Sequence, residues 1–445
     1  MLSQSFTSKN LRIIYDKENR KGDYIEKGFP AEVKEYSLII KRLRRVRSNL
    51  NKRKEKYSEE VFNYRFHKLK ESIKENDSKR DEVIDSHLEK ISQAIAKRTF
   101  KISIERNNSP HHHKETYRIN SELESFFAEK KIQQNIKSTY NVKQANRDIV
   151  ISQLKSVLDD AFPKQIIKTD ISGFYESIDS DILKSKINSN PKLSLASRKI
   201  ISQILNQYRS ITGSSKGIPR GIGISAYLSE LYMSEFDEKI KSMPGVVYYT
   251  RYVDDIIAVF TPSDFFTADD RQREIAELML NIGLSLNKNK TKIINYNKGV
   301  SYSIEYLGYI IRQHGGKLGI CASERKVDKY KDRLNTAFDK YSKSYGSDND
   351  KKLLLARVRM LTGNTKLTNN KGGAFVGIYH SNKWVDNLEF LDQLDHCLNI
   401  RALDLNCDTL KRKVMKFSFK RGFLNKEFRK FSTQDLKEIT RVWNQ

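Results

Sequence analysis

The chain has 445 residues, enough for two or three domains with a substantial core, although only 38% of its residues are hydrophobic. Its 82 Lys and Arg residues against 55 Asp and Glu residues give a formal net charge of +27, which makes a polyanion the expected partner. No run approaches the roughly 18 apolar residues of a membrane span, the N-terminus lacks the apolar core of a signal peptide, and the three cysteines form no CxxC pair. These features predict a soluble, cytoplasmic protein with no membrane partner.

The N-terminal part of the chain is predicted to be helical and basic over residues 1–98. Residues 30–98 place apolar side chains at helical spacing among charged ones. Within them, residues 41–70 hold twelve basic and three acidic residues. Such a density of positive charge is typical of a surface that neutralises phosphates.

Two short strands around a loop are predicted within residues 99–120. The loop contains His111, His112 and His113. Consecutive side chains do not easily converge on one ion, so a solvated loop is expected here rather than a metal site. Residues 121–162 return to a helical pattern.

A strand that ends in a carboxylate is predicted in KQIIKTDISGFYESIDSDIL, residues 164–183. Ile166 and Ile167 precede Asp170, after which the chain turns into a helix that carries Phe174 and Tyr175. The strand therefore delivers one acidic side chain to the end of a sheet.

A glycine-rich loop and a helix are predicted over residues 213–240. The glycines allow the backbone to approach a nucleotide closely, and Ser225 is expected to cap the helix. One face of that helix carries the apolar side chains of Leu228, Leu231, Tyr232, Phe236 and Ile240. A glycine-rich loop before a helix is a weak signal by itself.

Residues 246–260 are predicted to form two interior strands joined by a tight turn, because both sides of the turn are β-branched or aromatic. The turn carries Asp254 and Asp255. Two like charges at the edge of a core repel and lose hydration, so at least one should protonate unless a cation neutralises them. An exposed Asp-Asp turn is the alternative, since Asp is common in turns.

If the strand before Asp170 pairs with this hairpin, then Asp170, Asp254 and Asp255 meet at one end of the sheet. Three hard oxygen donors would suit two divalent cations, and Mg²⁺ is expected because it prefers carboxylates together with substrate phosphates; Mn²⁺ is an alternative. Such a pair serves in-line phosphoryl transfer.

From about residue 322 onward the pattern is mainly helical and basic. Residues 411–430 hold nine basic residues and one acidic residue, interleaved with Phe417, Phe419, Phe423 and Phe428. These rings either stack bases while the cations hold phosphates, or form the buried face of a basic helix.

The order of these elements resembles the palm of reverse transcriptases. TDISGFYESI, residues 169–178, is similar to their first palm motif. GIPRGIGIS, residues 217–225, is similar to the second, and YVDD, residues 252–255, to the third.

Three further segments extend the resemblance, which covers roughly residues 130–320. GLSLNKNKTKI, residues 283–293, resembles the lysine-bearing fourth motif, and EYLGYII, residues 305–311, resembles the primer-grip hairpin. Upstream, YNVKQANRDIV, residues 140–150, resembles the fingers segment that holds the incoming triphosphate.

The resemblance implies roles for individual residues. The catalytic carboxylates would be Asp170, Asp254 and Asp255, and the metal ligands would be these three with Ile171. Tyr175 would act as the gate against ribose. The remaining substrate-binding residues would be Lys143, Arg147 and Lys290 on the triphosphate, with Arg220 and Gly221 where template and nascent pair are gripped.

The resemblance also implies a right-hand polymerase fold of the α+β class with fingers and palm. We expect fingers over residues 99–165 and a palm over 166–321, with inserted fingers residues and a primer-grip hairpin near 302–312. A helical thumb or C-terminal domain would occupy residues 322–445, beside the helical N-terminal region.

Two features indicate a branch of the family. FYESI together with GIPRGIGISAYLSELYM, and a helical C-terminal extension in place of an endonuclease or RNase H domain, resemble bacterial defence-associated reverse transcriptases of the abortive-infection type. Residues 357–385 add to this resemblance. Arg220 stands where many members have Gln, and Ala226 stands where many have Pro, so the usual mode of template use is in question.

The implied activity is RNA-directed DNA synthesis from dNTPs in antiphage defence. The expected partners are an RNA template or noncoding RNA, the DNA product, and a homo-oligomer or partner defence protein. One alternative is a template-independent or protein-primed nucleotidyltransferase; another is a non-catalytic RNA-binding scaffold with a relic palm. Retention of all three Asp residues argues against a relic, since buried carboxylates without a metal only destabilise.

Overall fold

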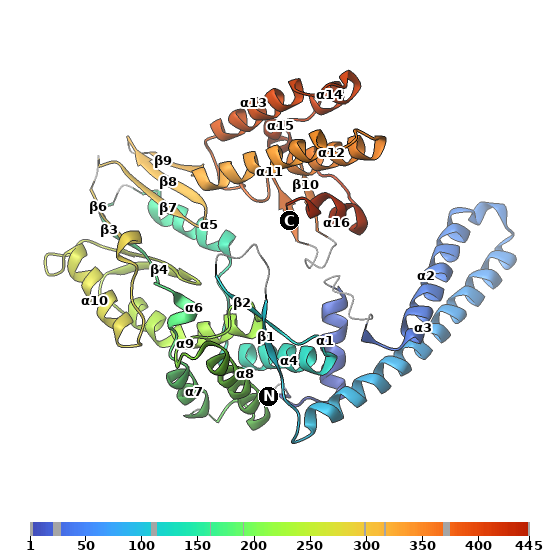
Figure 1. Cartoon of the computed structure of the whole chain (residues 1–445), viewed down its shortest axis with the longest axis horizontal. Coiled ribbons are helices and arrows are strands. Elements are labelled where there is room, and N and C mark those ends of the chain that lie inside the picture. Colours follow the sequence, from blue (N-terminus) through green and yellow to red (C-terminus); the bar gives the residue numbers. More distant parts are fainter. Residues whose placement is uncertain are drawn as a thin grey trace.

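A computed structural model of the chain describes residues 3–20, 28–107, 114–160, 162–189, 191–297, 300–315, 317–367 and 374–443. Helices and strands alternate through the middle of the chain, and helices dominate both ends, as predicted for an α+β polymerase fold (Figure 1). Among the described helices, none is long and apolar enough to cross a membrane. The proposed domain boundaries stay a prediction.

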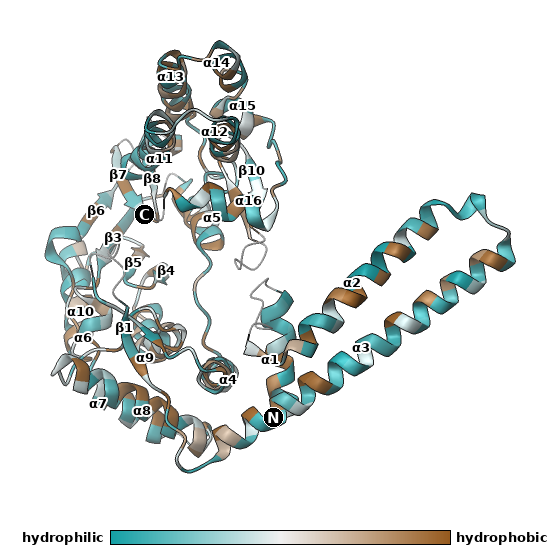
Figure 2. Ribbon diagram, turned by 45° about the vertical axis from the view of Figure 1, so that its right-hand side comes forward, coloured by the Kyte–Doolittle hydropathy of each residue, from teal (hydrophilic) through white to brown (hydrophobic). Residues whose placement is uncertain are grey.

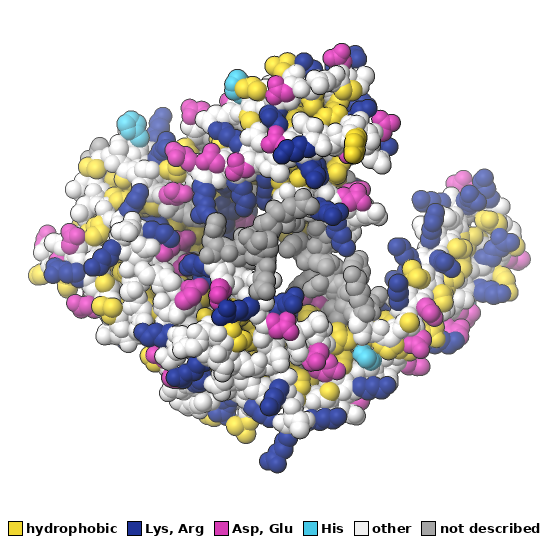
Figure 3. All heavy atoms as spheres, in the orientation of Figure 1, with side chains coloured by type: hydrophobic (Ala, Val, Ile, Leu, Met, Phe, Trp, Pro, Cys, Tyr) yellow, Lys and Arg dark blue, Asp and Glu magenta, His cyan; other side chains and the backbone are white. Residues whose placement is uncertain are grey.

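The N-terminal part is helical, as expected. Its helices are α1 (Ser8–Arg20), α2 (Ala31–Lys52) and α3 (Glu59–Ala96). Helices α2 and α3 form an antiparallel hairpin that projects from the rest of the protein (Figures 1 and 2). Lys and Arg side chains, many of them from residues 41–70, lie along this hairpin (Figure 3).

The hairpin is anchored at one end. The last turns of α3 bury Ile84, Leu88, Ile91 and Ile95 in the larger of the two hydrophobic clusters, at the spacing of one helix face. The start of α3 is set by Ser58, whose side chain accepts a hydrogen bond from the Val61 N–H.

A strand pair and two helices follow, as the pattern over residues 99–162 predicts. The pair is antiparallel and consists of β1 (Ile104–Asn107) and β2 (Thr116–Ile119). His111, His112 and His113 lie outside the described residues. The helices are α4 (Leu123–Tyr140) and α5 (Arg147–Leu158).

A four-stranded antiparallel sheet with the strand order β4-β5-β3-β6 forms the centre of the structure. Its strands are β3 (Lys164–Asp170), β4 (Val246–Tyr252), β5 (Asp255–Phe260) and β6 (Lys292–Tyr296). The register of β3 with β5 places Asp170 opposite Asp255. The predicted pairing of the first Asp strand with the hairpin is therefore confirmed.

Both faces of this sheet are covered, because successive strand residues point to opposite faces. Ile167 and Ile256 join the cluster that includes α9 (Gly223–Lys241) and α10 (Ala268–Leu280). Ile166 and Ile257 join the second cluster, which includes α5. The sheet is thus held rigidly between two hydrophobic layers.

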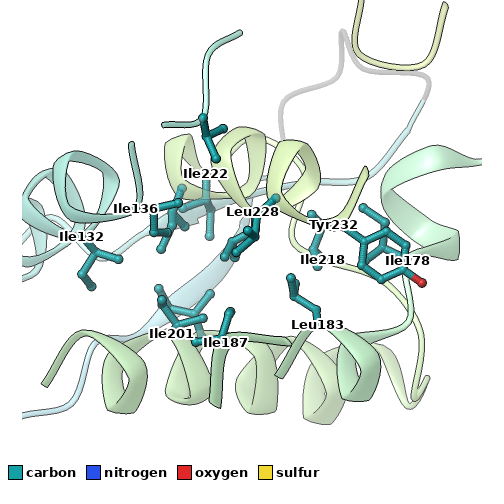
Figure 4. Packing of buried hydrophobic residues seen from close by; sticks show 14 of the residues in the cluster. Ile132, Ile136, Ile178, Leu183, Ile187, Ile201, Ile218, Ile222, Leu228 and Tyr232 are labelled. Atoms are coloured by element: carbon teal, nitrogen blue, oxygen red, sulfur yellow. The ribbon is translucent and has the colours of Figure 1, made fainter. Parts of the chain in front are cut away.

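Helices between β3 and α9 along the chain contribute to the same hydrophobic cluster as α9. They are α6 (Phe174–Ser177), α7 (Ser180–Ser189) and α8 (Leu195–Thr212). Figure 4 shows how residues of α4, α7, α8 and α9 interdigitate, among them Ile136, Leu183, Ile201 and Leu228.

Ser225 does not cap α9, so that prediction is wrong. The helix begins two residues earlier, at Gly223, and its N-cap residue Ile222 makes no side-chain hydrogen bond. Ser225 is buried in the first turn, where its hydroxyl donates to the Pro219 carbonyl oxygen at 2.7 Å. Its hydroxyl therefore fastens the glycine-rich loop to the helix instead of starting the helix.

A second, three-stranded sheet and the C-terminal helices complete the structure. The sheet contains β7 (Tyr302–Tyr306), β8 (Tyr309–His314) and β9 (Lys317–Ala322). The helices are α11 (Glu324–Ser342), α12 (Asp348–Leu361), α13 (Glu389–Leu403), α14 (Asp408–Val414), α15 (Phe419–Leu424) and α16 (Thr433–Arg441). An antiparallel strand pair, β10 (Asn364–Lys366) and β11 (Phe375–Gly377), lies between α12 and α13 along the chain.

The four Phe residues of the basic stretch 411–430 differ in how deeply they are buried. Phe419 and Phe423 are buried in the C-terminal core, so the buried-face interpretation is right for these two. Phe417 packs against the same core and is partly buried. Phe428 is 48% exposed and remains free to contact a ligand.

A buried arginine joins the hairpin to α9. Arg251 on β4 is 6% exposed, and its guanidinium donates to Glu230 at 2.6 Å and to Asp237 at 2.7 Å. The two carboxylates are seven residues apart on α9, and therefore on one helix face. A further contact, from Arg251 Nη1 to the Val253 carbonyl oxygen at 2.9 Å, holds the turn that carries Asp254.

Replacing Arg251 should be costly, because Glu230 and Asp237 would be left as uncompensated buried charges. We expect Arg251→Ala to lower the free energy of unfolding by about 3–5 kcal/mol, measured by urea denaturation. The triple variant Arg251→Ala, Glu230→Gln, Asp237→Asn should recover part of the loss. An Arg251→Ala protein as stable as the parent would show that this network does not hold the hairpin.

Candidate active site

Three acidic residues meet at one end of the central sheet. Asp170 is the last residue of β3 and lies opposite Asp255, the first residue of β5. The backbone N–H of Ile171 donates to the Asp254 carbonyl oxygen at 3.0 Å, which fixes the turn against β3. The sequence-based prediction that these side chains come together is confirmed.

The turn itself has an unusual backbone. Val253 has a φ of +61°, a conformation that β-branched residues rarely adopt. The Arg251 hydrogen bond to the Val253 carbonyl and the Ile171 hydrogen bond to the Asp254 carbonyl hold the turn from two sides. Strain of this kind persists only where the surroundings determine the conformation, and it is frequent at functional sites.

The electrostatics of the turn are those of a site with excess negative charge. Burial raises the pKa of Asp254, and the charge of Asp170 raises it further. Burial also raises the pKa of Asp255, and the charges of Asp254 and Asp170 add to the effect. The carboxylates therefore repel one another as the sequence predicted.

Two lysines offset part of this charge. Lys290 Nζ donates to Asp170 Oδ2 at 2.9 Å, and this hydrogen bond raises the pKa of Lys290. Lys168 Nζ lies 3.6 Å from Asp255 Oδ1. Lys290 was predicted from the resemblance; Lys168 was missed, although it stands two residues before Asp170 and so on the same face of β3.

The metal prediction depends on these carboxylates. Within the described ranges, no group of three or more His, Cys, Asp and Glu side chains is arranged so that it could hold a metal ion. Lys290 occupies one oxygen of Asp170. The donor chemistry fits a hard divalent cation, because two adjacent, partly buried carboxylates with raised pKa values gain from neutralisation. Ile171 has a buried side chain without donor atoms, so its predicted role could come only from its carbonyl oxygen.

Tyr175 and Arg220 lie together beside the carboxylates. The Arg220 guanidinium stands 4.8 Å from the centre of the Tyr175 ring. It also donates to both carboxylate oxygens of Glu176, at 3.0 and 3.2 Å. The charge of Arg220 opposes the rise in the pKa of Asp254, which burial causes. Glu176 is a further residue that sequence reasoning missed.

Gly221 is required by backbone geometry. Its φ is +96°, and a Cβ atom there would lie 2.8 Å from the Tyr117 carbonyl oxygen. The adjacent Arg220 carbonyl accepts a hydrogen bond from the Tyr117 N–H at 2.7 Å. The glycine-rich loop is thus packed tightly against β2, and this contact accounts for the glycine without any nucleotide.

Lys143 and Arg147 are not brought to the carboxylates. Arg147 Nε donates to the Leu307 carbonyl oxygen at 3.0 Å, and its guanidinium lies 4.8 Å from the centre of the Tyr309 ring. It therefore binds the turn of the predicted primer-grip hairpin. Lys143 is exposed. Their roles on the triphosphate stay predictions.

The β7–β8 hairpin touches the site directly. The Tyr306 hydroxyl donates to the Asp255 carbonyl oxygen at 3.2 Å. Tyr306 and Tyr309 are paired residues at the turn of this hairpin. The hairpin therefore links the acidic residues to the C-terminal helices that follow β9.

Solved structures similar to this chain include telomerases and a viral polymerase. Telomerase from Candida albicans in complex with a TWJ fragment of telomeric RNA has 12% identity and a TM-score of 0.33, over 71% of this chain and 54% of that one. Apo telomerase from Candida tropicalis has 12% identity and a TM-score of 0.35, over 71% and 56%. The RNA polymerase complex inside a dsRNA virus has 13% identity and a TM-score of 0.35, over 61% and 26%.

These likenesses are too weak to carry a conclusion, and the chain spans less than two thirds of the length of each of these structures. No curated protein matches the chain in sequence. A family model does match: residues 114–311 correspond to the reverse transcriptase (RNA-dependent DNA polymerase) family. The match includes the three acidic residues, the glycine-rich loop and most of the β7–β8 hairpin. The match to this family covers residues 114–311, which is less than half of the chain.

Proposed function

We propose that the chain is a reverse transcriptase-like DNA polymerase that joins dNTPs by two-metal phosphoryl transfer. The observation that carries the proposal is the pairing of β3 with β5, which places Asp170 beside Asp255 and the Asp254 turn within the residues that match the reverse transcriptase family. An acidic cluster whose charge is only partly compensated, at the end of a sheet, suits this chemistry better than a structural role.

The chain's own residues would divide the work as follows. Asp170, Asp254 and Asp255 would hold the divalent cations. When bound, two Mg²⁺ ions would activate the primer hydroxyl and stabilise the leaving oxygen of the nucleotide. Lys290 has a side chain that is 57% exposed, so its ammonium group can turn from Asp170 toward a phosphate. Lys168 would orient Asp255.

The nucleotide would lie between the turn and the glycine-rich loop. Tyr175 would stand beneath the sugar, with its ring position supported by Arg220. Lys143 and Arg147 would bind the triphosphate, which for Arg147 requires release of the Leu307 carbonyl. Gly221 would let the loop backbone come close to the nascent pair.

The partners and setting are also proposals. The charge of +27 and the basic α2–α3 hairpin support an RNA template or noncoding RNA as a partner. The resemblance to abortive-infection reverse transcriptases supports a role in bacterial antiphage defence in the cytoplasm, with a homo-oligomer or a partner defence protein. We retain the division into an N-terminal region, fingers, palm and thumb at residues 98, 165 and 321.

Two other functions would use some of the same features. A template-independent or protein-primed nucleotidyltransferase would use the same carboxylates, and it would incorporate dNTPs equally well with and without added RNA template. A non-catalytic RNA-binding scaffold would bind RNA without incorporating any nucleotide. A primer-extension assay with each dNTP, with and without RNA, separates the three functions.

Removing one carboxylate should abolish synthesis without abolishing nucleic-acid binding. We expect Asp170→Asn or Asp254→Asn to reduce nucleotide incorporation by about 100-fold or more. A chelator added to the parent should have the same effect. RNA affinity should stay nearly unchanged, because it depends mainly on phosphate contacts elsewhere. Asp264→Asn, at an exposed loop position, is the matched control. Full activity in either site variant would contradict the two-metal assignment.

Tyr175 should control the choice of sugar. A ring held against C2′ leaves room for hydrogen but not for a hydroxyl, and close-packed sites do not absorb an extra oxygen without cost. We expect Tyr175→Ala to improve ribonucleotide use relative to deoxyribonucleotide use by about 10- to 100-fold, measured from kcat/KM for each. Tyr175→Phe keeps the ring and should behave as the parent. Unchanged selectivity in a folded Tyr175→Ala protein would remove this residue from the sugar site.

A further inference from the structure

A group of aromatic side chains lies exposed near the junction between the palm and the C-terminal helices. Phe375 on β11 is 56% exposed, and Phe428 is 48% exposed. Their ring centres are 6.1 Å apart, and the His380 ring is 5.4 Å from Phe375. We refer to Phe375, His380 and Phe428 as the aromatic platform. Exposed apolar groups of this kind mark binding sites more often than single exposed residues do.

The platform is built on a rigid base. Asn364 on β10 is 1% exposed, and its side chain accepts from the Tyr379 N–H at 2.9 Å and the His380 N–H at 3.2 Å. The same residue pairs through its backbone with Phe428. Gly377 has a φ of +132°, and a Cβ atom there would lie 2.2 Å from the Gly363 carbonyl oxygen. The rings are therefore positioned before any ligand arrives.

The surroundings of the platform are positively charged. Lys366 Nζ lies 5.8 Å from the centre of the Phe375 ring, and Lys426 Nζ lies 4.8 Å from the neighbouring Tyr379 ring. Glu427, the acidic residue beside Phe428, is already paired with Arg421 and Arg429. A polyanion fits these charges. An apolar protein surface with few acidic residues would instead bury Lys366 and Lys426 without partners, which is costly.

The chain segment that carries Phe428 also borders a basic cavity. Glu427 and Arg429, on either side of Phe428, line a cavity of about 610 Å³. Most of its polar lining is cationic, and includes Lys352, Arg359, Lys413 and Lys416. The cavity adds positive charge beside the chain segment that carries Phe428, and this charge favours a polyanion.

Two hydrogen bonds connect the platform to the acidic residues. The Tyr309 hydroxyl donates to the carbonyl oxygen of Ser381, the residue after His380, at 3.1 Å. Its hairpin partner Tyr306 donates to the Asp255 carbonyl. β10 lies on the side of the C-terminal helices that faces the rest of the protein (Figure 1). The platform is thus joined to the acidic turn through the β7–β8 hairpin.

We propose that the aromatic platform binds the bases of a single-stranded nucleic acid that enters or leaves the polymerase site. The ligand class is an unpaired polynucleotide, either an RNA strand or the DNA product, since the two present the same stacking faces and phosphates. The position of the platform along a strand's path rests on the proposed polymerase function; its ability to bind a strand does not.

The test is equilibrium binding of labelled oligo(rU), oligo(dT) and a DNA duplex to the full chain, without nucleotides, at several salt concentrations. The strands should have about 20 nucleotides, longer than a typical site of ~4–16. The variant Phe375→Leu/Phe428→Leu keeps apolar bulk and removes the flat rings. Phe265→Leu, at a loop residue that is 88% exposed, is the matched control.

We expect the double variant to bind at least one of the two single strands about tenfold or more weakly, with duplex binding unchanged. The salt slope should stay as in the parent, because no cation has been removed. Loss for RNA alone assigns the platform to the RNA strand, loss for DNA alone assigns it to the product, and loss for both supports a site that accepts either. Restored binding by Phe375→Trp/Phe428→Trp would confirm that stacking is responsible.

Unchanged affinity for both single strands in the folded Leu variant would overturn the inference. The polymerase proposal is tested separately. A parent that binds strands through the platform but incorporates no dNTP would contradict only the proposed function, and a parent that incorporates dNTPs while the Leu variant binds normally would contradict only this inference.

Discussion

The antiparallel pairing of β3 with β5 is the constraint on which the rest of the site depends. It brings Asp170 next to Asp255 although 85 positions separate them along the chain. A shift of this pairing by one residue would turn Asp170 to the opposite face of the sheet and would exchange Ile166 and Ile167 between the two closely packed clusters. Because both faces of the sheet are buried in separate hydrophobic clusters, such a shift is strongly disfavoured.

The hydrophobic layers fix the register of the strands, but they also force like charges into a partly buried position. They bring like charges together at the sheet end, where burial raises the pKa of Asp254 and of Asp255. Lys290 and Lys168 offset part of this charge. Arg251 holds the strained turn through its hydrogen bond to the Val253 carbonyl oxygen. The turn keeps excess negative charge, which the divalent cations of our proposal would neutralise.

Sequence reasoning succeeded where a short-range pattern determines the outcome. Runs of β-branched and aromatic residues predicted β3, β4 and β5, and the strand end predicted the position of Asp170. It failed for Ser225, where tight backbone packing of the glycine loop starts α9 earlier than capping preference suggests. Partners that lie far apart in the chain, such as Glu230 with Arg251 or Arg147 with Leu307, leave no local pattern and could be found only in the structure.

The most direct test of this account is a crystal structure of the chain with Mn²⁺ and a non-hydrolysable dNTP. The account predicts anomalous peaks within about 2.0–2.3 Å of carboxylate oxygens of Asp170 and of the Asp254–Asp255 turn, with Lys290 moved from Asp170 to a phosphate. Mn²⁺ bound elsewhere, with Lys290 still hydrogen-bonded to Asp170 in the presence of the nucleotide, would contradict it.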